Sequence, residues 1–91
     1  MKVVVNRCYG GFGLSEEAYE FLGLEWDGYG YAYNDYGLRT DEKLIGCVET
    51  LGYKANGRFA DLEVVEIPDD VEWEIDYYDG IETIEEVHRS W

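Results

Sequence analysis

The fold is decided by residues 62–76, which read LEVVEIPDDVEWEID. The apolar run 62–67 predicts a buried strand, and the Pro-Asp-Asp that follows it predicts a turn. Beyond the turn, Val71, Trp73 and Ile75 alternate with acidic residues, which is typical of a half-buried strand. We therefore expect two strands joined by the proline turn and paired antiparallel, with Trp73 in the core.

Two helices are predicted upstream of this stretch. Ser15 is a good N-cap for the first helix, and Gly23 can end it. Thr40 or Asp41 can cap the second helix, which Gly52 ends. The buried stripe of the second helix is expected to consist of Leu44, Ile45, Val48 and Leu51.

The remaining elements follow from shorter patterns. The β-branched run 3–5 predicts a central strand, expected to lie parallel to strand 62–67 through a right-handed crossover. Tyrosines alternate with small residues over 29–33, which predicts a short strand with a tyrosine face. Residues 81–88 fit a short terminal helix or a strand. The sequence thus predicts one α+β domain over 1–91, with two layers, two main helices and a mixed sheet of three to four strands.

Charge is the strongest compositional signal. The chain carries 21 acidic and 7 basic residues, for a formal net charge of −14. Such a surface offers little lysine or arginine to phosphate, so direct nucleic-acid binding and binding to anionic membranes are not expected. The charge serves solubility alone, or it attracts the basic face of a protein partner.

Location and cofactors are bounded by simple counts. No run approaches the ~20 apolar residues of a membrane span, and the N-terminus lacks the apolar region of a signal peptide. Cys8 and Cys47 are expected to be buried free thiols, which suits a reducing cytoplasm. With one histidine and no paired-cysteine motif, neither a metal nor another cofactor is expected.

Several segments resemble a family of small acidic proteins encoded by bacteriophages and prophages. The resemblance is carried by VNRCYGGFGLS at 5–15, ANG at 55–57, VVEIPDDVEWEI at 64–75, and YDG at 78–80 followed by HRSW at 88–91. The tyrosine-rich middle departs from the family, as does Glu42, where a proline is more typical. The resemblance implies a phage origin and transfers no activity.

Three arrangements that could carry catalysis or phosphate binding are better explained structurally. The Gly10–Gly13 loop matches no phosphate-binding motif, and the acidic residues that follow it would repel an anion. Cys8 and His88 could form a nucleophile pair, but no third orienting group is marked. Glu72 and Glu74 are expected on a solvated strand face rather than in a cleft. We therefore expect no enzymatic activity and no catalytic residue.

Two groups of residues remain as candidate binding sites. The first is a surface for a protein partner, in which tyrosines supply contact area at low entropic cost unless they merely cover a core edge. It consists of Tyr29, Tyr31, Tyr33, Tyr36, Glu72 and Glu74. The second is a nucleotide site in which arginine and aromatic side chains stack and pair, unless they simply form ion pairs with nearby acids. It consists of Arg7, Tyr9, His88, Arg89 and Trp91.

The leading hypothesis is a phage accessory protein that acts in the cytoplasm of the infected bacterium. It would bind and inhibit a host protein, such as a defence factor, by covering a basic face with its acidic, tyrosine-rich surface. The alternative is a small-molecule binder that sequesters a nucleotide signal. Self-association as a homo-oligomer is left open.

Overall fold

The structure is a computed structural model that describes residues 1–87. Its elements, in chain order, are β1 (Lys2–Asn6), α1 (Glu16–Leu22), η1 (Tyr36–Leu38), α2 (Glu42–Leu51), η2 (Gly52–Ala55), β2 (Leu62–Glu66), β3 (Trp73–Tyr78) and β4 (Ile81–Glu86). The predicted α+β class is confirmed. The four strands form two separate antiparallel pairs, β1–β2 and β3–β4, rather than one mixed sheet.

The predicted parallel pairing of the first strand with strand 62–67 is wrong. β1 and β2 run antiparallel, with Val4 opposite Val64. The reason lies at the end of β1, where the chain turns away to build both helices and then returns. The Arg7 amide donates to the Asp61 carbonyl at 2.8 Å, so β2 begins where β1 ends and must run back along it.

The C-terminal strands also pair differently from the prediction. β3 pairs with β4, not with β2, because the turn at Asp79 and Gly80 returns the chain immediately. Both turn residues have positive φ, which is the geometry of a tight hairpin. Residues 81–86 are accordingly a strand, which was one of the two expected outcomes. Trp73 is only half-buried, so its predicted place in the core is wrong.

Both helices begin and end where the sequence predicts. The Ser15 hydroxyl accepts from the Ala18 amide at 3.1 Å, and Gly23 ends α1 in the left-handed conformation. The Asp41 carboxylate caps α2 by accepting from the amides of Lys43 and Leu44. These caps satisfy amides that have no partner within a helix.

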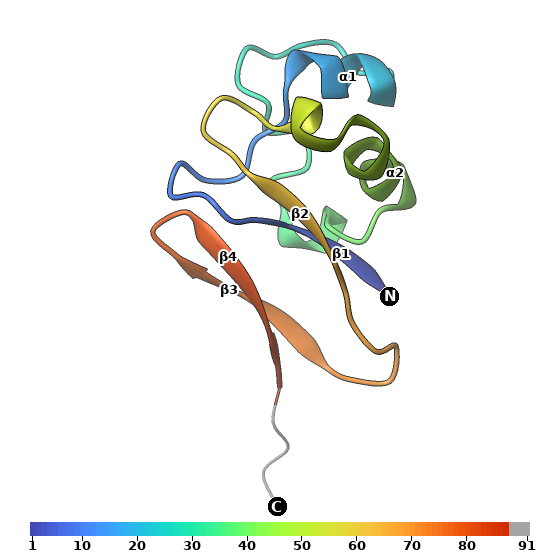
Figure 1. Ribbon diagram of the computed structural model, residues 1–91, viewed down its shortest axis with the longest axis vertical. Helices are drawn as coiled ribbons and strands as arrows, with labels where there is room; N and C mark the ends of the chain where they lie inside the picture. Colours follow the sequence, from blue (N-terminus) through green and yellow to red (C-terminus); the bar gives the residue numbers. More distant parts are fainter. Residues whose placement is uncertain (88–91) are drawn as a thin grey trace, which may run out of the picture.

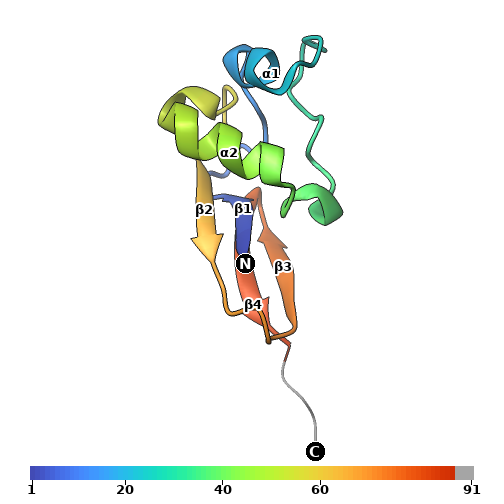
Figure 2. The same ribbon diagram turned by 90° about the vertical axis from the view of Figure 1, so that its right-hand side faces the viewer.

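The core lies between the two helices and one face of β1–β2. Val4, Leu14, Ala18, Leu44 and Cys47 are fully buried within it. The opposite face of β1 is also closed, since Val3 and Val5 are fully buried as well. In Figures 1 and 2 the helices lie toward one end of the molecule and the β3–β4 hairpin toward the other, with β1 and β2 between them. β1 is therefore buried on both faces, as predicted, but it pairs only with β2 and is not a central strand.

The tyrosine-rich segment is not the predicted strand. Between α1 and η1 the chain forms turns, and both Gly28 and Gly30 have positive φ. At Gly30 a side chain would lie 2.2 Å from the Leu14 carbonyl oxygen, so this position requires glycine. The turns at these glycines thus prevent the strand that the alternation of tyrosines with small residues predicted. Cys8, expected to be buried, is only half-buried, whereas Cys47 is buried and both thiols are free.

Candidate functional site

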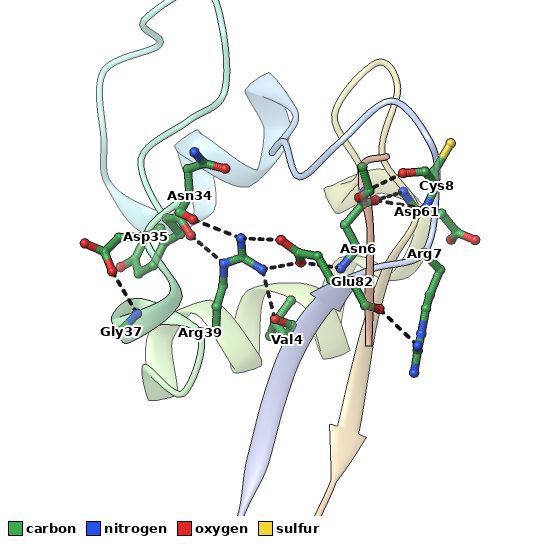
Figure 3. Close-up of polar contacts among 12 residues, drawn as sticks. Val4, Asn6, Arg7, Cys8, Asn34, Asp35, Gly37, Arg39, Asp61 and Glu82 are labelled. Carbon is green, nitrogen blue, oxygen red and sulfur yellow. Dashed lines mark hydrogen bonds and ion pairs between the residues drawn. The ribbon is translucent and has the colours of Figure 1, made fainter. Parts of the chain in front are cut away.

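An ion pair closes the free edge of β1, where a third strand would otherwise pair. The Val4 amide donates to the Arg39 carbonyl at 2.9 Å, and the Asn6 amide donates to Glu82 Oε1 at 2.9 Å. Figure 3 shows Arg39 and Glu82 meeting beside this edge. Backbone groups that an open strand edge would expose are thereby satisfied.

Arg39 and Glu82 form a buried, two-pronged pair. Arg39 is 0 % exposed and Glu82 is 2 % exposed. Arg39 Nη2 donates to Glu82 Oε2 at 2.9 Å, and Nη1 donates to Glu82 Oε1. Its Nε and Nη2 also donate to the carbonyls of Tyr33 and Asn34, each at 2.9 Å, and its Nη1 to the Val4 carbonyl at 3.4 Å. The pair therefore joins the hairpin to the end of the tyrosine-rich segment.

Asn6 ties three more segments to the same point. Its side-chain amide donates to the carbonyls of Cys8 and Gly80, both at 2.7 Å, while its Oδ1 accepts from the Asp61 amide at 2.8 Å. No buried side-chain nitrogen or oxygen within residues 1–87 lacks a hydrogen-bond partner. The network thus holds the Gly10–Gly13 loop, the hairpin turn and the start of β2 in fixed positions.

The tyrosine-rich segment is anchored by Tyr19 and Asp27. Tyr19 is buried, donates its hydroxyl to Asp27 Oδ2 at 2.8 Å, and accepts from the Ala32 amide at 2.9 Å. Asp27 Oδ1 accepts from the amides of Tyr29 and Gly30, each at 2.7 Å. The bonds from Gly30 and Tyr29 are the main reason that the pKa of Asp27 falls to about 2. The exposed tyrosines therefore project from an ordered loop.

A hollow of about 490 Å³ lies between this loop, the Gly10–Gly13 loop and the inner face of the hairpin. It is lined by Gly10, Gly11, Phe12, Tyr31, Asn34, Asp35, Tyr36, Tyr77 and Glu82. We call it the tyrosine hollow. Tyr31 is 59 % exposed and Tyr77 is 57 % exposed, so both rings are open to a partner. The buried ion pair lies at one wall, where Glu82 is a lining residue.

The predicted partner surface is brought together only in part. Tyr31 and Tyr36 line the tyrosine hollow, and Tyr29 stacks on Tyr31 with 5.9 Å between ring centroids. Tyr33 is half-buried and packs against the core, which is the alternative left open for this row. Glu72 and Glu74 are exposed, as predicted.

Glu74 does not share the hollow with the tyrosines. Residues directly opposite each other in an antiparallel pair lie on the same face. Tyr77 lies opposite Glu82 on the inner face of the hairpin, whereas Glu74 lies opposite Glu85 on the outer face. The hairpin therefore separates the aromatic surface from an acidic one.

The predicted nucleotide group is not assembled within the described residues. Arg7 Nε pairs with Glu63 at 3.0 Å and its Nη1 donates to the Glu82 carbonyl at 3.1 Å, which is the ion-pairing alternative. Arg7 lines a smaller groove of about 190 Å³ with Trp73 and Ile84. Tyr9 is exposed and lines neither of these two depressions. His88, Arg89 and Trp91 lie outside the described residues.

Three polar residues that organise the site were not predicted from the sequence: Asn6, Arg39 and Glu82. Only Glu82 stands out in the sequence pattern. In a strand over 81–86 it shares a face with Ile84, so an acidic residue stands at an inward position. Arg39 lies just after η1 and has no sequence pattern of its own.

Within residues 1–87, no three histidine, cysteine or carboxylate side chains come together in a way that could hold a metal ion. None of the helices in this part of the chain is long and apolar enough to cross a membrane.

No protein-family model matches the chain, and no curated protein or solved structure is significantly similar to it.

Proposed function

We propose that this chain is a protein-binding domain and that the tyrosine hollow is its contact site for a basic partner. The observation that carries the proposal is the gathering of exposed tyrosines from two distant segments at one depression. Tyr31 and Tyr36 come from the loop after α1, and Tyr77 comes from the hairpin. Tyrosines at a depression with fixed walls are typical anchors of protein interfaces.

The charge of the chain supports a basic partner. With a formal net charge of −14, the molecule attracts positive surfaces and repels nucleic acid. Several basic side chains are already paired, including Lys2 with Glu49 at 2.9 Å and Arg39 with Glu82. Asp35 and the outer-face residues Glu74 and Glu85 are exposed, and their charge can steer a partner toward the molecule.

The resemblance to phage proteins adds the biological setting. In that setting the partner is a protein of the infected bacterium, and covering its basic face inhibits it. A basic face that normally holds nucleic acid is the natural target of an acidic surface. We propose a non-catalytic mode of action, in which binding alone blocks the partner.

The experiment is site-specific photocrosslinking in a bacterial lysate. A photoreactive phenylalanine analogue replaces Tyr31, which lines the hollow, or Tyr53, which is exposed on η2 and does not line it. We expect one basic protein to be captured through position 31 and not through position 53, with capture weakened by high salt. Equal capture from both positions, or no capture from position 31, would contradict the proposal.

A further inference from the structure

We propose that the tyrosine hollow is a receptor for a guanidinium group, so that an arginine side chain of the partner inserts into it. This inference rests on the proposed function and names the chemistry that the hollow selects. It follows from the aromatic lining, from a carboxylate at the rim that forms no ion pair within residues 1–87, and from a guanidinium that the protein already holds against two rings of the lining.

The aromatic lining already stabilises one guanidinium. Arg39 Cζ lies 3.7 Å from the centroid of the Phe12 ring and 5.3 Å from that of Tyr36. Both rings also line the hollow. A planar guanidinium stacks on aromatic faces, whereas a lysine ammonium is a compact and strongly hydrated charge. The ring set therefore suits arginine, and Tyr36 is still 44 % exposed beside Arg39.

The inserted group cannot take the place of Arg39. Glu82 presents both carboxylate oxygens to Arg39, and its Oε1 also accepts from the Asn6 amide. Arg39 is fully buried, and its donors are held by backbone carbonyls as well. A second guanidinium must therefore bind above this pair, between Tyr31, Tyr36 and Tyr77.

Asp35 supplies the counter-charge at this place. It lines the hollow and is exposed. Its Oδ1 accepts from the Gly37 amide at 2.8 Å, while its Oδ2 makes no hydrogen bond within residues 1–87. An arginine inserted between the rings would thus meet a carboxylate oxygen that has no partner in the described chain. Burial, followed by the negative charge of Glu82, raises the pKa of the nearby Tyr36 above its usual value.

The size of the hollow agrees with this use. Its volume of about 490 Å³ falls within the range of roughly 300–1,000 Å³ that is usual for ligand sites. A small anion has no support here, because the charged residues that line the hollow are the carboxylates Asp35 and Glu82. A side chain that combines positive charge with a flat face is the ligand that the lining fits.

The test is an NMR titration that requires no partner. The probes are three blocked amino acids: N-acetyl-arginine methylamide, the lysine equivalent, and the citrulline equivalent, which has nearly the shape of arginine without its charge. We expect saturable shifts at Gly10, Gly11 and the rings of Tyr31, Tyr36 and Tyr77 with arginine. We expect binding about fivefold or more weaker with lysine and with citrulline. Equal binding of arginine and citrulline, binding of lysine as tight as that of arginine, or shifts elsewhere would overturn the inference.

Two variants and a matched control localise the effect. Tyr77→Leu and Asp35→Asn should each weaken arginine binding about fivefold to tenfold, while the asparagine introduced at position 35 can still accept from the Gly37 amide. Tyr78→Leu is the control, because Tyr78 lies on the outer face of the hairpin opposite Ile81. Unchanged binding in both hollow variants would overturn the inference. Failure of the titration with successful crosslinking at position 31 would overturn the inference and leave the protein-binding proposal standing. Arginine binding without crosslinking at position 31 would remove the protein partner and leave only the guanidinium site.

Discussion

Glu82 joins β4 to two other segments, the end of β1 and the residue that follows η1. Its oxygens accept from Arg39 and from the Asn6 amide, and its carbonyl accepts from Arg7. Removing one partner of a buried ion pair leaves the other charge uncompensated. The arrangement therefore makes position 82 far more sensitive than a typical glutamate of an acidic chain.

The first prediction concerns this position. We expect Glu82→Gln to lower the free energy of unfolding by about 3–5 kcal/mol, because the Arg39 charge stays buried without its counter-ion. Chemical denaturation measures the change. Glu85→Gln is the matched control: Glu85 is an exposed glutamate of the same strand, opposite Glu74, and should be neutral or slightly stabilising. Equal effects of the two substitutions would show that the buried pair is not formed.

The second prediction concerns Asp27, whose pKa is lowered from 3.8 to about 2 chiefly by the Gly30 and Tyr29 amides. Between about pH 4 and pH 2 the Asp27 carboxyl binds more protons in the unfolded chain than in the folded one. The stability that the ionised Asp27 contributes is therefore complete above pH 4 and is lost as the pH falls toward 2. We expect Asp27→Asn to be less stable than the wild type near neutral pH, with the difference shrinking over that acid range. A difference that stays constant with pH would contradict the assigned hydrogen bonds.

At the scale of elements, the helices could be predicted and the strand pairing could not. Ser15, Gly23, Asp41 and Gly52 act on neighbours a few residues away, and such signals are visible in the sequence. Strand pairing depends on where the chain returns in space. The reversal of β2 is set by the contact of Arg7 with Asp61, which no local pattern reveals.

The candidate site shows the same difference between local features, which could be predicted, and long-range contacts, which could not. The tyrosine row could be singled out from the sequence because nine tyrosines in 91 residues are a strong compositional signal. Their conformation could not be predicted, since Asp27 and Gly30 replace the expected strand with turns. The ion pair joins residues 43 positions apart and leaves almost no trace in the sequence. Only the folded chain brings the two residues together.

The third prediction concerns the hairpin. Trp73 lies on the face shared with Ile75 and Ile84, but it is half-buried and lines the smaller groove. We expect Trp73→Ala to cost about 1–2 kcal/mol, below the ~3–5 kcal/mol of a fully buried aromatic residue. Chemical denaturation again gives the value. A loss within the range of a core aromatic residue would mean that the hairpin packs more tightly than the structure shows.

At the level of the whole molecule, the two faces of the hairpin carry different kinds of side chain. Its inner face contributes Tyr77 to the tyrosine hollow, while its outer face carries Glu74 and Glu85 side by side. Like charges directly opposite each other destabilise a sheet, so this pair lowers folding stability, while its negative charge adds to the field that would steer a basic partner. Substitutions on the inner face are thus expected to change how tightly a partner is held, and substitutions on the outer face how fast it associates.

The fourth prediction tests the steering. The double substitution Glu72→Lys and Glu74→Lys should slow association with a basic partner and reduce its dependence on salt. It should not unfold the domain, because both side chains are exposed and the lysine introduced at position 74 would face Glu85 across the hairpin. Association kinetics at several ionic strengths measure the effect. An unchanged association rate would mean that the charge serves solubility alone.

The tyrosine hollow is proposed to anchor a protein partner. The decisive measurement uses the partner identified by crosslinking, in its native form without the crosslink. Its rate of dissociation from immobilised Tyr36→Leu and from immobilised Tyr78→Leu is measured at one ionic strength. Tyr36 lines the hollow, and Tyr78 is an exposed tyrosine outside it. We expect dissociation about tenfold or more faster for Tyr36→Leu, because anchor residues act on the dissociation rate, and no change for Tyr78→Leu. Equal dissociation rates for the two variants would show that the hollow is not the anchor.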